Sequence, residues 1–262
     1  MLPPGSFCAS ACTISTFDNW SVSANLGVVI EQQRMSGDER RAAIVKAVLP
    51  LFARQGFSNT TTRELAEAAG VSEALLYKHF PSKDSLYAEI QNFGKQGRDP
   101  ALEKLATLEP STSTLVHIIY YIMRTAAMGR PNDPIGWETR HRLILTSCLE
   151  DGDFPRYLFN TQFSCCLDKI DACLGAAQKA GDLVSSPVAT QNRCLFSHHL
   201  ACMIGIMHLP KNPVVNYRVS RQDILNQAVW FVLRGMGLTD QAIVTYYHAE
   251  ALSLFFGLGI AS

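Results

Sequence analysis

Hydrophobic positions recur with a helical period along almost the whole chain from residue 38 onward. In the first such segment, one helical face carries Ile44, Ala47, Val48, Leu51 and Phe52 at i, i+3, i+4, i+7 and i+8. This spacing predicts a helix with one buried side. No segment alternates apolar and polar residues over a length that would indicate a half-exposed strand. The pattern therefore predicts an all-α fold.

Glycine, proline and capping residues divide this pattern into separate helices. Gly56 ends the first helix, and Pro50 within it is expected to bend or loosen it, because proline lacks the N–H that the helical ladder needs. A serine or threonine precedes each of the next three helices, as is typical of an N-cap. The predicted helices span 38–55, 62–69, 73–80, 83–96, 101–108, 111–128, 134–149, 154–180, 187–208, 220–235 and 239–256.

The chain divides into three regions by this pattern. Residues 1–37 have few charges and no helical period, and three interpretations remain open: a disordered arm, a functional arm, or a wrongly assigned upstream start with Met35 as the true first residue. Residues 38–95 form a small unit of short helices. Residues 96–262 form a larger helical bundle, without internal repeats or low-complexity tracts.

The composition excludes several classes of protein. Basic and acidic residues balance at 23 each, so any contact with nucleic acid must come from local placement rather than overall charge. No apolar run reaches the roughly 18 residues of a membrane span, and the N-terminus lacks the basic start of a signal peptide. The eight cysteines lack the spacing of a small disulfide-rich domain, which favours free thiols in the cytoplasm.

Residues 62–81 carry the strongest functional signal. A short helix, capped by Thr61 or Thr62, is followed by Gly70, where the chain must turn through a left-handed conformation that glycine adopts cheaply. A second short helix starts after Ser72. The inner faces of the two helices and the turn between them carry apolar residues, namely Leu65, Ala66, Val71, Leu76 and Phe80. This is the helix-turn-helix pattern, in which the second helix is presented outward.

The outward residues suit the reading of a DNA groove. Candidates for base-edge contacts are Glu73, Ala74, Leu75, Lys78 and His79, which combine short, apolar and hydrogen-bonding side chains. Candidates for backbone contacts, including phosphate donors, are Thr61, Thr62, Arg63, Ser72, Tyr77 and Lys83. Glu73 is the least predictable of them, because it either accepts from a cytosine amino group or turns toward Lys78 or Arg63.

The stretch "GFSNTTTRELAEAAGVSEALLYKHFPSKDSLYAEI" resembles the N-terminal domain of tetracycline-repressor-like (TetR-family) regulators over about residues 38–95. The likeness combines G-F-x-x-T-T before the second helix, A-x-x-A-G-V-S at the turn and L-Y-x-H-F-x-x-K after it. Farther along, "AAQKAGDL" and "WFVLRGMGL" are similar to recurring phrases of the family.

The resemblance implies a homodimer that acts on DNA. Each N-terminal unit would place its recognition helix in a major groove of a near-palindromic operator, with contacts at the residues named above. A small ligand in the C-terminal body would release the DNA, as in a repressor, and no cofactor is implied. Basic and acidic residues nearly balance over 36–95, so the salt dependence of DNA binding should be moderate.

Two further expectations concern the C-terminal unit, residues 96–262: a ligand pocket and a dimer interface. Apolar and aromatic residues on helices that flank the family's pocket suggest a hydrophobic ligand, the alternative being plain core. The ligand candidates are Phe93, Ile118, Tyr121, Ile122, Trp137, His141 and Phe163. Segments 187–208 and 220–235 are apolar on more than one face, which predicts a four-helix dimer interface across about 187–235.

The cysteine and histidine residues of the C-terminal unit leave open a second mode of regulation, by thiol chemistry or a metal. A thiol- or metal-responsive regulator of the same fold would use residues such as Cys165, Cys166, Cys173, Cys194, His198, His199, Cys202 and His208. We favour the interpretation that the cysteines are buried as small apolar residues and that the histidines lie in or beside the dimer interface. Glu138, His141 and Asp153 could serve an enzyme, but the sequence has no phosphate loop, nucleophile elbow or H-E-x-x-H motif. We therefore predict neither catalysis nor a bound metal.

Overall fold

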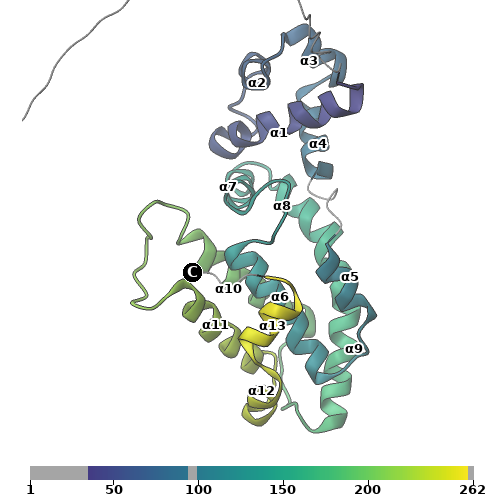
Figure 1. The fold of residues 1–262 in the computed structure, drawn as a ribbon, viewed down its shortest axis with the longest axis vertical. Coiled ribbons are helices and arrows are strands. Elements are labelled where there is room, and N and C mark those ends of the chain that lie inside the picture. The colour runs from purple at the N-terminus through teal and green to yellow at the C-terminus, as the bar shows by residue number, and fades with distance from the viewer. Residues whose placement is uncertain (1–34, 94–98, 259–262) are drawn as a thin grey trace, which may run out of the picture. The chain divides into compact units, whose positions relative to one another are not determined.

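The computed structural model describes residues 35–93 and 99–258, apart from the side chains of 162–165. Over these residues the chain is helical and has no strand, with one isolated bridge between Leu183 and Leu238. This confirms the all-α prediction (Figure 1). The elements are α1 (Gly37–Gln55), α2 (Thr62–Ala69), α3 (Glu73–His79), α4 (Lys83–Phe93), α5 (Pro100–Thr107), α6 (Thr112–Met128), α7 (Trp137–Cys148), α8 (Asp153–Leu158), the π-helical turn η1 (Phe159–Phe163), α9 (Ser164–Ala180), α10 (Thr190–Ile206), α11 (Arg221–Gly235), α12 (Asp240–Tyr246) and α13 (Ala249–Phe255).

The first helix begins slightly earlier than predicted. The Ser36 hydroxyl accepts from the Glu39 N–H at 3.2 Å, and the Glu39 carboxylate accepts from the Ser36 N–H at 2.7 Å. This reciprocal capping box starts α1 at Gly37. Ser36 is thus the N-cap of this helix and Gly37 its first residue, whereas residues 1–34 of the extension predicted for 1–37 lie outside the described residues. The helix continues through Pro50 to Gln55.

Two of the predicted long helices are interrupted. The segment predicted as 154–180 is divided into α8, η1 and α9, because a π-helical turn inserts between two α-helices, as is common near functional sites. The segment predicted as 239–256 breaks at Tyr247, whose backbone is extended (φ −96°, ψ 102°). That break lets both α12 and α13 pack against α6. The end of the helix predicted for 83–96 falls on residues that are not described.

The buried apolar residues form two clusters. One lies among α6 and α9 to α13, with Tyr120, Leu115 and Met123 of α6 fully buried in it. The other is centred on α1 to α4, with Phe52, Leu86 and Ile90 at its centre, but it also takes in residues from α7, α8 and the turn before α7. Those additional members are Ile135, Leu143 and Phe154. Helix α7 is therefore part of the core that supports the N-terminal helices (Figure 1).

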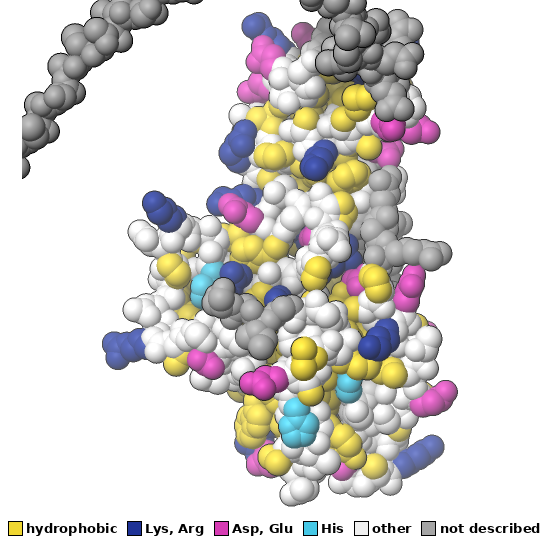
Figure 2. Space-filling view, viewed as in Figure 1, with side chains coloured by type: hydrophobic (Ala, Val, Ile, Leu, Met, Phe, Trp, Pro, Cys, Tyr) yellow, Lys and Arg dark blue, Asp and Glu magenta, His cyan; other side chains and the backbone are white. Residues whose placement is uncertain are grey.

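Charged side chains of both signs are interspersed over the visible face of the molecule (Figure 2). This agrees with the balanced composition of the chain. No helix of the described residues combines the length and the hydropathy that crossing a membrane requires.

Candidate nucleic-acid interface and ligand cavity

Gly70 makes the turn between α2 and α3. Its backbone is left-handed (φ +64°, ψ 31°), the conformation that glycine adopts without steric cost. The N–H groups of Gly70 and Val71 donate to the carbonyls of Glu67 and Ala66 at 3.1 and 3.0 Å, which satisfies the free carbonyls at the end of α2. The apolar residues predicted for the inner faces of α2 and α3 are buried there (Leu65, Ala66, Leu76 and Phe80).

The outward face of α3 is exposed as predicted for most of its residues. Glu73, Ala74, Tyr77 and Lys78 are exposed, whereas Leu75 and His79 are half-buried. Tyr77 keeps 45% of its surface accessible, although aromatic side chains are mostly buried in folded proteins. An exposed aromatic and an exposed cation side by side on a short, well-anchored helix are available to a partner.

Arg41 of α1 anchors the far end of α3, and the sequence analysis did not identify it. Its guanidinium donates to the His79 carbonyl and to the Glu89 carboxylate, the latter at 3.0 Å, and lies 4.3 Å from the centre of the Phe80 ring. A cation is favourable at a helix C-terminus, where the last carbonyls lack partners. Such long-range pairing between α1, α3 and α4 leaves no signal in the local pattern.

Hydroxyl groups at the start of α2 are already engaged within the domain. Thr61 caps α2: its hydroxyl accepts from the Glu64 N–H at 3.3 Å and donates to the Glu64 carboxylate at 2.7 Å. Hydrogen bonds from Thr61 hold the pKa of Glu64 below its ordinary value. The Thr62 hydroxyl lies 3.3 Å from a carboxylate oxygen of Glu73. Glu73 therefore contacts Thr62 rather than Lys78 or Arg63, the two side chains that the sequence analysis proposed as its partners.

The two remaining basic candidates have different surroundings. Arg63 pairs with Glu67 one turn along α2 at 3.0 Å, and both side chains are well exposed, so the pair is weak and exchangeable. The Lys83 ammonium is half-buried and donates to the carbonyls of Phe57 and Thr60 at 2.8 and 3.0 Å. Lys83 therefore holds the loop before α2, which departs from the predicted role as a free phosphate donor.

Glu150, just after α7, binds two backbone amides of that same loop. One carboxylate oxygen accepts from the Phe57 N–H at 2.9 Å and the other from the Ser58 N–H at 3.1 Å. Gly56 has a positive φ of +79°, and a Cβ at this position would lie 2.5 Å from the Glu150 carboxylate. Only glycine allows both the backbone conformation and the close approach. The carboxylate therefore ties the end of α7 to the residues that precede α2.

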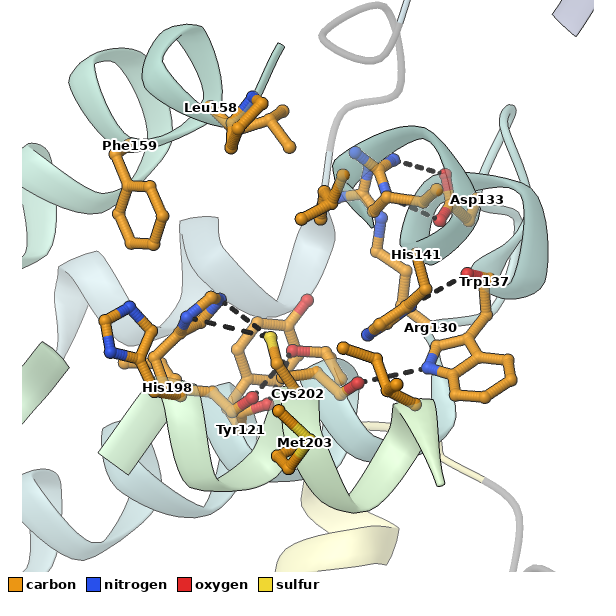
Figure 3. A pocket seen from close by; sticks show the side chains of 18 of the residues that line it. Tyr121, Arg130, Asp133, Trp137, His141, Leu158, Phe159, His198, Cys202 and Met203 are labelled. Atoms are coloured by element: carbon orange, nitrogen blue, oxygen red, sulfur yellow. Dashed lines mark hydrogen bonds and ion pairs between the residues drawn. The ribbon is translucent and has the colours of Figure 1, made fainter. Parts of the chain in front are cut away.

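A cavity of about 420 Å³ lies among α6, α7, α8, η1, α9 and α10. This volume is within the range of pockets that bind small organic ligands. Its lining is mostly apolar and includes Ile122, Ile144, Leu158, Phe159 and Met203, several of which are labelled in Figure 3. Helix α7 contributes Trp137, Arg140, His141, Ile144, Leu145 and Cys148 to it.

Four of the predicted ligand residues line this cavity. They are Tyr121, Ile122, Trp137 and His141. Two others are placed elsewhere: Phe93 packs against the N-terminal core, and Ile118 is buried in the core of the C-terminal helices. The side chain of Phe163 is not described.

The sequence analysis did not include several polar residues of the cavity among the ligand candidates. Asp99, Arg130 and Asp133 lie outside the helices, and His198 and Cys202 were assigned to other sites. Asp99 pairs with Arg130 at 3.0 Å, and Asp133 pairs with Arg140 at 2.6 Å. The sequence analysis gave His198 and Cys202 as candidates for a metal site and favoured burial or a place at the dimer interface for them. They do lie 3.5 Å apart, but on the wall of the cavity (Figure 3).

Burial favours the neutral forms of Cys194, Cys202 and His198. Burial raises the pKa of Cys194 to about 11 and that of Cys202 to about 12. Burial, with His199 nearby, lowers the pKa of His198 to about 4. A thiol that remains protonated is a poor nucleophile and a poor metal ligand. Among the described residues, no group of three or more acidic, histidine or cysteine side chains could hold a metal ion.

The N-terminal helices match a known family. Residues 44–90 fit the model of bacterial regulatory proteins of the tetR family. Nucleoid occlusion factor SlmA of Alteromonas mediterranea is 32% identical over 92 residues, which are 35% of this chain and 47% of that protein. SlmA of Haemophilus ducreyi is 30% identical over 104 residues, 39% of this chain and 52% of that protein. The chain thus spans about half the length of these curated relatives.

Solved structures extend the likeness to the C-terminal helices at the level of fold. AibR, in complex with isovaleryl coenzyme A and operator DNA, superposes with a TM-score of 0.53 at 17% identity, covering 73% of this chain and 97% of AibR. The ketosteroid transcriptional regulator KstR2 of Mycobacterium tuberculosis gives 0.51 at 17% identity, covering 76% and 96%.

The geometry and the comparisons agree on the N-terminal unit. A left-handed glycine joins two short helices, their inner residues are buried and the second helix presents an exposed face. The family model covers this same unit, and the fold of the remaining helices is that of solved members. The N-terminal unit, over residues 44–90, is thus similar to the tetR family of bacterial regulatory proteins.

Proposed function

We propose that this chain is a homodimeric transcriptional regulator that binds a near-palindromic operator through α3 and releases it when an apolar ligand enters the cavity. The observation that carries the proposal is the exposed face of α3, with Tyr77 and Lys78 held outward by Gly70, Arg41 and the buried Leu76. A helix of this kind enters a major groove, where side chains can read base edges. Residues 38–95 would form the DNA-binding unit, which would act in the cytoplasm, and 96–262 the regulatory unit.

Selection of bound duplexes from random-sequence DNA tests the operator proposal. Two symmetry-related α3 helices read two half-sites separated by about one helical turn, which corresponds to 10–10.5 base pairs or a multiple. We expect the selected sequences to converge on an inverted repeat with that spacing. A pool that remains random after successive rounds would contradict the proposal.

Exposed apolar side chains on α10 and α11 support dimerisation. Phe196 on α10 and Phe231 on α11 expose 62% and 69% of their surfaces, and Met203 and Trp230 are also partly exposed. Large apolar groups that gather on two packed helices are typical of an interface with a partner. Two such helices from each chain would form a four-helix contact, as the sequence pattern suggested.

Helix α7 gives the cavity a direct route to the DNA-binding unit. Its Trp137 and His141 face the cavity, whereas Leu143 belongs to the core of α1 to α4. At its end Glu150 holds the Phe57 and Ser58 amides of the loop before α2. A ligand that displaces α7 would therefore move both the core and the loop that position α2 and α3.

Replacing Glu150 with alanine tests this route. Hydrogen bonds to a charged group contribute about 1.5–3 kcal/mol each, and because Glu150 is exposed to solvent the lower end applies. We expect amide hydrogen exchange at Phe57 and Ser58 to quicken by about tenfold and operator affinity to fall with it.

Glu138→Ala is the matched control, because Glu138 is an exposed carboxylate on the same helix that pairs only with Arg142 among the contacts described. Exchange at Phe57 and Ser58 should stay unchanged in this variant. If both variants behave alike, the Glu150 carboxylate does not couple the two units.

A further inference from the structure

The charges on the polar wall of the cavity cancel. Asp99 pairs with Arg130 and Asp133 with Arg140, and all four side chains are at least 80% buried. The Tyr121 hydroxyl adds a hydrogen bond to Asp99. Both guanidinium groups that line the cavity thus already face a carboxylate. A charged ligand would have to break one of these buried pairs, at a large cost in free energy.

His141 presents a hydrogen-bond acceptor to this cavity. Its Nδ1 lies 2.9 Å from the Trp137 carbonyl oxygen, and since a carbonyl can only accept, Nδ1 carries the proton. In the neutral ring, Nε2 then has a free lone pair. The residue is only 2% exposed, and Nε2 is buried without a hydrogen-bond partner. In Figure 3 the ring projects from α7 among the residues that line the cavity.

The surroundings keep this ring neutral. Burial lowers the pKa of His141, and the positive charges of Arg140 and Arg221 act in the same direction, whereas the nearby carbonyls of Trp137 and Ala126 oppose the shift. The Ala126 carbonyl beside the cavity is also an acceptor and already receives the Trp137 indole N–H at 3.0 Å. A ligand in this part of the cavity therefore meets acceptors, and an acceptor buried without a donor is unfavourable.

We propose that the cavity selects an uncharged, largely apolar ligand with one hydroxyl or N–H group, which donates to Nε2 of His141. The apolar remainder would contact Ile122, Ile144, Leu158 and Phe159. This ligand class rests on the proposed function, in which the cavity is the site that controls DNA binding. The hydrogen bond orients the ligand against α7, the helix that also carries the Glu150 contact.

Three compounds that share one apolar chain test the ligand class. 4-Heptylphenol has a hydroxyl donor, 4-heptylanisole replaces it with a methyl ether, and 4-heptylbenzoate carries a negative charge. Each is titrated against the full-length protein at neutral pH, with displacement of the neutral dye Nile red as the readout. We expect the phenol to bind about tenfold more tightly than the anisole, because the anisole leaves Nε2 unpaired. The benzoate should bind most weakly.

Two histidine variants assign the effect to one atom. His141→Phe keeps a flat ring without the acceptor, so the preference for phenol over anisole should disappear. His199→Phe alters another histidine of the cavity wall and should keep the preference. In the unmodified protein, the ¹⁵N resonance of His141 Nε2 should move on addition of the phenol but not of the anisole, a readout that needs no variant to fold.

Each outcome decides a separate point. Equal binding of phenol and anisole, tightest binding of the benzoate, or a preference that survives in His141→Phe would overturn the ligand class and leave the cavity as a binding site. If no compound displaces the dye or shifts the resonance, both the ligand class and the role of the cavity fail. The selection experiment measures operator binding independently of the cavity. A failure of the proposed DNA-binding function would therefore appear in that experiment and not in the ligand titrations.

Discussion

Operator affinity is expected to fall by roughly 30-fold to 10⁴-fold when Lys78 is replaced by alanine. Lys78 is exposed on the outward face of α3, where its ammonium can donate to base acceptors in the major groove. Loss of one base contact costs about 1–3 kcal/mol, and a symmetric dimer loses it twice, or about 2–6 kcal/mol in total. Fluorescence anisotropy with the selected operator at fixed salt measures the change.

The pattern of the loss separates base reading from phosphate contact. Lys78→Ala should also relax the sequence preference at one position of each half-site, whereas Tyr77→Ala should weaken binding to all sequences alike. Lys179→Ala removes an equal charge from the exposed surface of α9 and should change affinity little. If Lys78→Ala and Lys179→Ala have the same small effect, α3 is not the reading helix.

A Phe231→Glu variant is expected to be monomeric at micromolar concentration. Phe231 is 69% exposed on α11, and a carboxylate at the centre of an apolar dimer interface would lose its hydration without gaining a partner. Because a dimer engages two half-sites at once, loss of the second head should reduce operator affinity by about 10²-fold to 10⁴-fold. Light scattering reports the mass, and anisotropy reports the affinity.

Leu254→Glu provides the matched control for this variant. Leu254 is a similarly exposed apolar residue, at 77%, but lies on α13. It should leave both the dimer and the operator affinity intact. A dimer that survives Phe231→Glu would move the interface away from α11.

The N-terminal unit could be predicted from the sequence because its determinants are local. The turn at Gly70, the cap at Ser72 and the inner apolar residues act within a few positions of one another, and the structure places them as the pattern indicated. Contacts between distant residues were not accessible in this way. Arg41 reaches His79, and Lys83 reaches Phe57, through packing that no local spacing reveals.

The cavity was only partly predictable for a related reason. Apolar helical residues can face either a core or a cavity, so periodicity could not show that, of two residues in the same buried cluster, Tyr121 lines the cavity and Ile118 does not. The breaks at η1 and Tyr247 were missed because no glycine or proline marks them. His198 and Cys202 contact each other and line the cavity, a place that the sequence pattern did not indicate.

The measurement that tests the central claim most directly is a titration of the unmodified protein against two duplexes of equal length and composition. One contains the selected inverted repeat and the other a scrambled sequence, and both are measured at physiological salt with excess competitor DNA. Sequence-specific regulators bind their sites about 10³-fold or more tightly than other DNA, so we expect at least that ratio here. Equal affinity for the two duplexes would contradict the assignment of α3 as a sequence-reading helix.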